Sequence, residues 1–133
     1  MGLKMRKEII ICIVIVVAIF VGNFVTQKYE KESIESTTKM LEDLKIEFSE
    51  KEVKKEDVKD KIDNIHREWD KRHDKLAYFI EHDELEKVET NLTGLRSYIE
   101  TQEYEEAIKE LDEGVFILKH IEEKNKFNLE NIF

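Results

Sequence analysis

The chain has 133 residues, of which 40% are charged, with four glycines, no proline and a single cysteine. A composition this poor in helix breakers and rich in Glu, Lys, Leu and Ile predicts helix and excludes an all-β fold. The net charge is −9 and the acidic domain has no basic face. Nucleic acid is therefore excluded as a partner, because its phosphates would be repelled.

Residues 9–25 are the first predicted element and read IIICIVIVVAIFVGNFV, without a charged side chain. As a helix this segment rises about 26 Å, and flanking basic side chains that reach the headgroups extend it across a hydrocarbon core of about 30 Å. It has no small-residue cleavage site, and Ile11 before Cys12 does not suit a lipoprotein signal. An uncleaved signal anchor is therefore favoured over a cleaved signal peptide.

The basic N-terminus sets the predicted orientation. Lys4, Arg6 and Lys7 precede the apolar segment, whereas acidic and basic residues alternate after it. The positive-inside rule then predicts a single-pass cell membrane protein with its N-terminus in the cytoplasm and its C-terminal domain outside. We expect a basic N-terminus at residues 1–8, a bilayer-contacting span at Ile9–Val25, a helical stalk at 26–50, and a helical bundle at 51–133 to which the stalk contributes.

The stalk shows a hydrophobic seam. Ile34, Leu41 and Phe48 repeat every seven residues, with Thr37 and Leu44 between them, as along the buried side of a helix. The seam then fails at lysines within SEKEVKKED, where Ser49 and Glu52 form a capping-box pattern, so we predict a turn. The heptad phase continues through residue 76, however, so a continuous coiled-coil rod to residue 80 is the alternative.

Three further helices are predicted from apolar residues three or four positions apart. The first ends at His82-Asp83, the next begins with a capping box of Asp83 and Glu86, and the last begins at Thr101. Ala107 and Gly114 are predicted to allow a close helix approach. The predicted core positions are Val58, Ile62, Ile65, Trp69, Leu76 and Phe79; Leu85, Val88, Leu92, Leu95 and Ile99; and Tyr104, Ala107, Ile108, Leu111, Val115, Leu118 and Ile121.

One constellation has the spacing of metal ligands. His66, Asp70 and His73 follow one another at i, i+4 and i+7, on one side of a predicted helix. Metal sites in bundles draw ligands from several facing helices, and these residues flank the core seam. Solvated charge is therefore the favoured interpretation and a surface zinc site the alternative.

The sequence contains none of the motifs of catalysis that we searched for. It has no Gly-rich phosphate loop, no nucleophile elbow and no Cys/His pairing, so we expect no catalytic residue, no cofactor and no enzyme activity. Trp69, Tyr98 and Tyr104 are candidates for partner contacts, although core packing is the favoured role of each.

From Trp69 onward the chain resembles a bacterial family of single-span membrane proteins, the domain-of-unknown-function family 4363. The segments that carry the resemblance are W69…LAYFIEHDELEKVE, L92…LRSYI, A107-I…LKHIEEK and the closing LENIF. The resemblance implies an N-terminal span with a helical remainder. It implies no activity and no catalytic residues.

These observations predict an all-α chain in which a transmembrane helix continues into a stalk and an antiparallel bundle. The leading functional hypothesis is an interaction protein whose acidic domain binds a membrane or envelope protein. The alternatives are a self-associating coiled-coil rod, which would be a homo-oligomer, and a sensor domain for a small ligand or metal.

Overall fold

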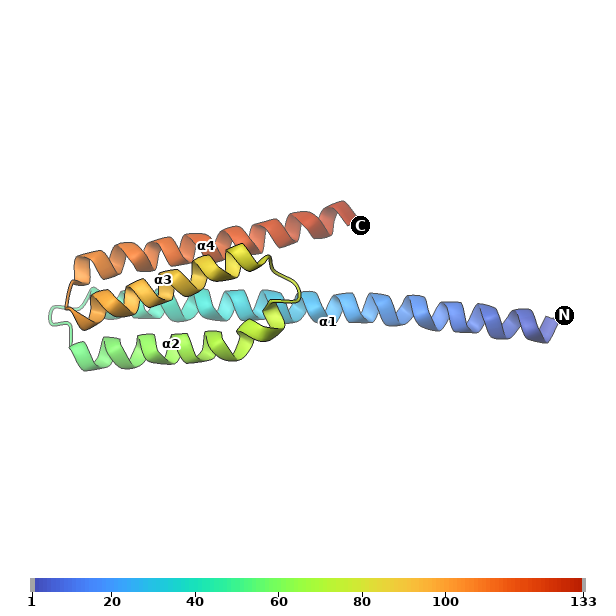
Figure 1. Ribbon diagram of the computed structural model, residues 1–133, viewed down its shortest axis with the longest axis horizontal. Coiled ribbons are helices and arrows are strands. Elements are labelled where there is room, and N and C mark those ends of the chain that lie inside the picture. The colour runs from blue at the N-terminus through green and yellow to red at the C-terminus, as the bar shows by residue number, and fades with distance from the viewer. Residues whose placement is uncertain (1, 133) are drawn as a thin grey trace.

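The computed structural model describes residues 2–132, with the side chains of residues 4–127. It has four helices within this range: α1 (Gly2–Phe48), α2 (Lys55–Leu76), α3 (His82–Glu100) and α4 (Tyr104–Ile132). The N-terminal half of α1 projects alone, and its C-terminal half packs with the other three helices (Figure 1). The predicted all-α fold with an apolar N-terminal helix and an antiparallel bundle is confirmed.

The projecting half of α1 contains the apolar segment. Helix α1 includes a stretch of mean hydropathy 3.0, none of which is buried inside the molecule. Among the residues that the structure describes, this is the helix that is long and apolar enough to cross a membrane. Because α1 has no break between Gly2 and Phe48, the apolar segment continues directly into the part of α1 that belongs to the bundle.

The bundle has an up-down-up-down topology. Helix α1 packs on α2 and α4, and α3 packs on the same two helices, so α1 and α3 occupy opposite corners. The predicted stalk is thus one of the four bundle helices. It buries Ile34, Leu41, Leu44 and Phe48 against its neighbours.

The chain turns between α1 and α2, so the continuous rod through residue 80 is wrong. Residues 49–54 connect the two helices, and the half-buried Val53 packs against the core there. The Ser49–Glu52 capping box is also wrong, because Lys54 precedes α2 in an extended conformation and no side chain caps the helix. Lysines in the seam position favour this turn, since a continuous core would have to bury their charges.

Most predicted core positions are buried, and Tyr104, Ile108 and Val115 are half-buried against the core. Trp69 is fully buried at the centre, and Ala107 and Gly114 are buried where α4 meets its neighbours. Phe79 is the exception, because it is 43% exposed while Ile80 is buried in its place. Helix α2 ends at Leu76, six residues before the predicted end, and the following turn breaks the helical period that placed Phe79 inside.

The ends of α3 also differ from the predictions. The residue before its first turn is Glu81, without a side-chain cap, so Asp83 does not form the expected capping box. Thr101 ends α3 and does not begin α4. Gln102 follows with a positive φ of 59°, while the Glu103 amide donates to the Tyr98 carbonyl at 2.9 Å and the Gln102 amide to that of Ile99 at 3.1 Å. This is a Schellman motif with glutamine where glycine is usual.

Candidate functional sites

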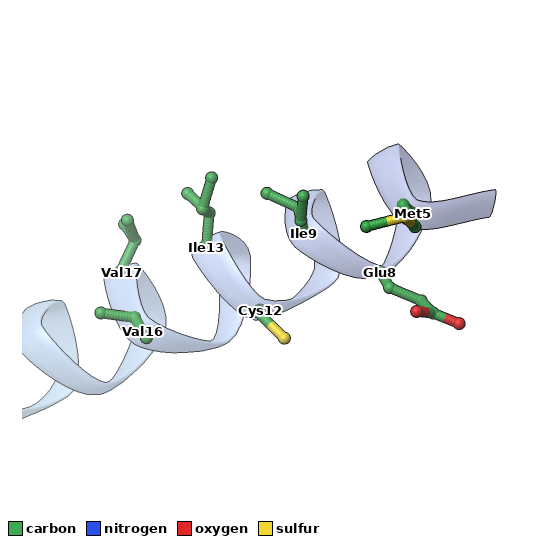
Figure 2. Close-up of a pocket in the computed structure, with 7 residues that line it drawn as sticks. All are labelled: Met5, Glu8, Ile9, Cys12, Ile13, Val16 and Val17. Carbon is green, nitrogen blue, oxygen red and sulfur yellow. The ribbon is translucent and has the colours of Figure 1, made fainter. Parts of the chain in front are cut away.

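A hollow on α1 lies at the start of the segment predicted to cross the membrane. Its lining side chains come from one face of this single helix, including Ile9, Cys12 and Val16 (Figure 2). Since no second helix faces it, the hollow is a groove between neighbouring side chains of an exposed apolar surface. Apart from Glu8 and the Cys12 thiol its lining is apolar, which is suited to contact with lipid chains.

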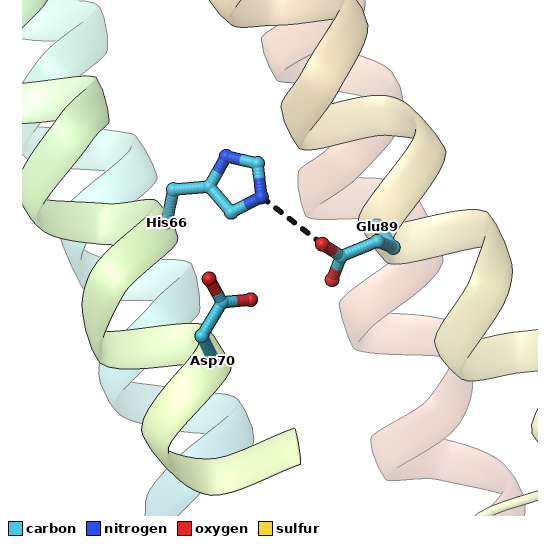
Figure 3. A group of neighbouring side chains, drawn as sticks. All are labelled: His66, Asp70 and Glu89. Atoms are coloured by element: carbon cyan, nitrogen blue, oxygen red, sulfur yellow. Dashed lines mark hydrogen bonds and ion pairs between the residues drawn. The ribbon is translucent and has the colours of Figure 1, made fainter.

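A polar cluster joins α2 to α3. His66 on α2 lies with its Nε2 3.1 Å from Oε1 of Glu89 on α3, and Asp70 lies one turn further along α2 (Figure 3). One ligand atom from each of these three residues lies within 4.8 Å of the others. The His66 side chain is 15% exposed, whereas Asp70 is exposed to solvent. The three groups form an open site at the bundle surface.

The cluster differs from the predicted ligand set in one member. His73 is not part of it, its Nδ1 lies 3.6 Å from the carboxylate of Asp74, and Glu89 is the third member. Sequence spacing identifies pairs on one helix, whereas Glu89 reaches the site only because α3 packs on α2. One imidazole and two carboxylates are suitable ligands for a divalent cation.

A groove runs along the outer surface between α3 and α4. It encloses about 1000 Å³, and we call it the α3–α4 groove. From Asp83 to Tyr98 it follows α3 for about 22 Å of helical rise. Phe116 stands at its edge with 71% of its surface exposed. Its lining residues are Asp83, Glu86, Lys87, Thr90, Asn91, Gly94, Ser97, Tyr98, Glu110, Glu113, Phe116 and Ile117.

The groove is acidic. Four carboxylates line it against a single lysine, Lys87. Burial raises the pKa of Glu110, and the neighbouring carboxylate of Glu113 raises it further, while a hydrogen bond from Asn91 opposes them. Asn91 Nδ2 donates at 2.7 Å to the Glu110 carbonyl and at 2.9 Å to its carboxylate, which holds this acid at the groove floor. A basic group entering the groove would relieve the repulsion between these carboxylates.

The three aromatic candidates have different environments. Trp69 is completely buried, so its side chain cannot contact a partner and belongs to the core. Tyr104 is half-buried, with its ring centroid 5.8 Å from that of Phe48, at the end of the bundle away from the projecting half of α1. Tyr98 is half-buried and lines the α3–α4 groove. Phe116, which the sequence did not single out, is the more exposed aromatic of this groove.

A further cavity is lined by residues of α1 and of the C-terminal part of α4. It encloses about 320 Å³, and we call it the membrane-proximal cavity because it begins two residues after the predicted span. Its lining residues are Gln27, Glu30, Lys31, Ile34, Glu122, Asn125 and Lys126.

Glu30 is the unusual member of this cavity. The residue is only 7% exposed, and its Oε1 has no hydrogen-bond partner among the described residues. Burial raises the pKa of Glu30 to about 7, and the negative charge of Glu84 on α3 contributes. Burial also raises the pKa of Glu122, and the adjacent carboxyl of Glu35 raises it further. The cavity thus holds two carboxyl groups with raised pKa values, and the charges of Lys31 and Lys126 act against the rise at Glu122.

Lys124 on α4 is paired with acids other than Glu30. Lys124 Nζ lies 3.1 Å from Glu81 and 3.3 Å from Glu84, so it compensates those acids. In the sequence Glu30 is one of many acids in a charged helix, and no pattern marks it for burial. Its burial depends on α4 covering this part of α1, which only the tertiary structure shows.

Comparisons with known proteins identify a family for most of the chain. A family model described as a domain of unknown function (DUF4363) matches residues 24–132, which include all four bundle helices and exclude most of the apolar segment. Searches among curated proteins and among solved structures gave no match.

Proposed function

The chain belongs to the DUF4363 family, whose function is unassigned, and we propose that it is a membrane-anchored protein whose bundle binds another membrane or envelope protein. In this proposal α1 crosses the cell membrane with the N-terminus in the cytoplasm, and the bundle lies outside. Its role is binding and not catalysis. The α3–α4 groove is the proposed binding surface.

The observation that supports this proposal most directly is the combination of charge and apolar surface in the groove. Four carboxylates line it with one lysine, and Phe116 beside it is 71% exposed. An exposed aromatic next to a recess is typical of an interface anchor. The chemistry fits a basic, amphipathic helix or extended segment of the partner, which would place apolar side chains on Phe116 and cations near Glu110 and Glu113.

A site-specific photo-crosslinker tests the surface. It is placed at residue 116 or, as a control, at residue 46, where Ile46 is 63% exposed on α1 outside the groove. In cells that express the full-length protein, we expect a discrete crosslink to a membrane protein from position 116, weakened at least tenfold by Glu113→Lys. Equal products from both positions, or no effect of the charge reversal, would contradict this assignment.

Topology is tested with an impermeant thiol reagent. Cys12 lies within the proposed span, so a new cysteine at the exposed Glu105 is the only one expected to react from outside intact cells. Labelling of Glu105→Cys before lysis supports the proposed orientation. Labelling only after lysis would place the bundle in the cytoplasm.

A second candidate function is divalent metal binding, favoured by the convergence of His66, Asp70 and Glu89. Zn²⁺ at a hundred times its Kd would stabilise the native state by about 2.7 kcal/mol. Thermal unfolding of the full-length protein in detergent should therefore show a Zn²⁺-dependent rise in Tm. His66→Ala should abolish the rise and His73→Ala should preserve it; the same response in both variants would exclude this site.

A further inference from the structure

The membrane-proximal cavity joins a buried acid to two basic residues at its edge. Glu30 is 93% buried by its neighbours, and its Oε1 lacks a hydrogen-bond donor among the described residues. Asn125 Nδ2 is also buried and lacks an acceptor there. Lys31 and Lys126 line the same cavity and are exposed. In this cavity Glu30 therefore requires a hydrogen-bond donor or a cation, whereas Asn125 and the two lysines favour an acceptor or an anion.

The position of the cavity along α1 is the second observation. Gln27 and Lys31 follow Val25, the end of the predicted span, by two and six residues, which is about 3–9 Å of helical rise. The headgroup layer extends over a similar distance beyond the hydrocarbon core. The inference rests on the membrane anchoring proposed above, because only then does this cavity face lipid headgroups.

Other side chains at the end of the bundle next to the predicted span also suit the level of the lipid headgroups. Lys75, near the end of α2, lies with Nζ 5.6 Å from the ring centroid of Tyr29 on α1. The turn after α2 exposes Tyr78 by 84% and Phe79 by 43%. Exposed aromatic side chains are typical of the boundary between membrane and water. This end of the bundle therefore has the composition of a surface that rests on headgroups.

We propose that the membrane-proximal cavity binds the zwitterionic headgroup of an ethanolamine phospholipid from the adjacent leaflet. The ammonium group donates to the carboxylate of Glu30, with Glu122 nearby. The phosphate accepts from Asn125 and lies near Lys31 and Lys126. A glycerol headgroup lacks the cation that Glu30 requires, and a choline headgroup has no N–H to donate.

The charged groups in and beside the cavity support a bound cation at Glu30. Glu84 on α3 raises the pKa of Glu30, and Glu122 and Glu35 form a second acidic pair on α4 and α1. Lys124 is paired with Glu81 and Glu84, and Lys31 lies 3.9 Å from Glu35. An ammonium group from the ligand would compensate the acid that these lysines leave uncompensated.

The test uses the full-length protein in nanodiscs that contain equal amounts of ethanolamine and choline phospholipids with the same acyl chains. Lipids retained on the protein after gentle extraction are counted by native mass spectrometry. We expect at least tenfold enrichment of the ethanolamine lipid, because a charge-assisted hydrogen bond to a buried carboxylate is of that strength. Glu30→Gln should reduce the ratio to that of the bulk lipid, and Glu123→Gln, an exposed acid on α4, should not.

Three outcomes would overturn the proposal: equal retention of both lipids by the wild-type protein, unchanged enrichment in Glu30→Gln, and displacement of the lipid by the free headgroup. Free O-phosphorylethanolamine is added in a third arm; if it displaces the lipid at equimolar concentration, the lipid assignment is wrong and a soluble zwitterion is the ligand. Recovery of the protein in the nanodisc fraction reports anchoring independently, so a failure of lipid selectivity is distinguishable from a failure of anchoring.

Discussion

Gly114 on α4 lies directly against Asn91 on α3, and the Asn91 carboxamide occupies the space that a side chain at position 114 would need. A Cβ at this position would overlap Asn91 Oδ1 and lie 3.5 Å from Cδ1 of Leu41 on α1. Asn91 is held in place by its hydrogen bonds to Glu110. Three helices therefore approach one another closely at a single glycine.

Gly114→Ala should destabilise the bundle. The added methyl group must displace a hydrogen-bonded, 4% exposed amide, and such overpacking costs about 1–3 kcal/mol, more than the gain in helix propensity. Thermal unfolding monitored by circular dichroism measures the loss. Gly94→Ala is the matched control, because its Cβ would lie 3.6 Å from the Glu110 side chain at ordinary contact distance, and we expect it to be neutral or stabilising. Equal effects at both glycines would contradict the close approach.

Gln102→Gly should stabilise the connection between α3 and α4. Gln102 has a positive φ of 59°, and a left-handed conformation costs a non-glycine residue about 1 kcal/mol. We expect a gain of roughly 0.5–1 kcal/mol in the free energy of unfolding, measured by urea denaturation. The same substitution at Glu100, within the last turn of α3, should lower stability, since helical backbone gives glycine no advantage there.

Glu30→Gln should alter the dependence of stability on pH in lipid-free detergent. Because burial raises the pKa of Glu30 to about 7, the native state holds the Glu30 proton more tightly than the unfolded state does. The resulting gain in the free energy of unfolding is fully present below the unfolded pKa near 4.5 and is lost as the pH rises through 7. Wild-type stability should therefore fall between pH 5 and pH 8, by at most about 3 kcal/mol from this group. Glu30→Gln should remove that fall and raise the Tm at pH 8 while changing little at pH 5. A parallel pH profile in the variant would show that Glu30 does not titrate in this range.

Trp69 should report the state of the whole core. It is fully buried, and Trp69→Ala should cost about 3–5 kcal/mol through the cavity it leaves. Trp69→Phe should cost less, because Nε1 has no hydrogen-bond partner among the described residues to lose. Stability is measured by urea denaturation, with Tyr78→Ala as the control, since Tyr78 is 84% exposed. In the native protein Trp69 emission should resist acrylamide quenching, and easy quenching would contradict its burial.

Residues that repeat with helical period were predictable from sequence because the apolar face of a helix must be buried somewhere. Ile34, Leu41 and Phe48 in α1, and Ile62 and Trp69 in α2, are buried as their spacing indicated. The turn at 49–54 was also predictable, since lysines interrupt the seam. The ends of the helices were less predictable from sequence. No side chain caps the start of α2 or α3, and the sequence patterns that resemble caps lie at other residues.

The candidate sites depend on contacts between helices, which a single sequence does not show. His66 and Asp70 share a helix and were found from their spacing, whereas Glu89 comes from α3. The burial of Glu30 depends on α4, and that of Asn91 on the absent side chain of Gly114. In each case a polar residue with ordinary spacing acquires its environment from a partner far along the chain.

In the proposed topology, the uninterrupted α1 would fix the height of every bundle surface above the bilayer. From Val25 to Phe48 the helix rises about 34 Å, so in the proposed topology no part of the α3–α4 groove lies much further than that from the lipid. A bundle tethered by a flexible linker could take many heights and orientations above the membrane. This bundle would instead diffuse at one height, with the groove at a constant angle to the membrane. Only partners that present a matching segment at that height would meet it, and a rotation of α1 in the membrane would turn the groove by the same angle.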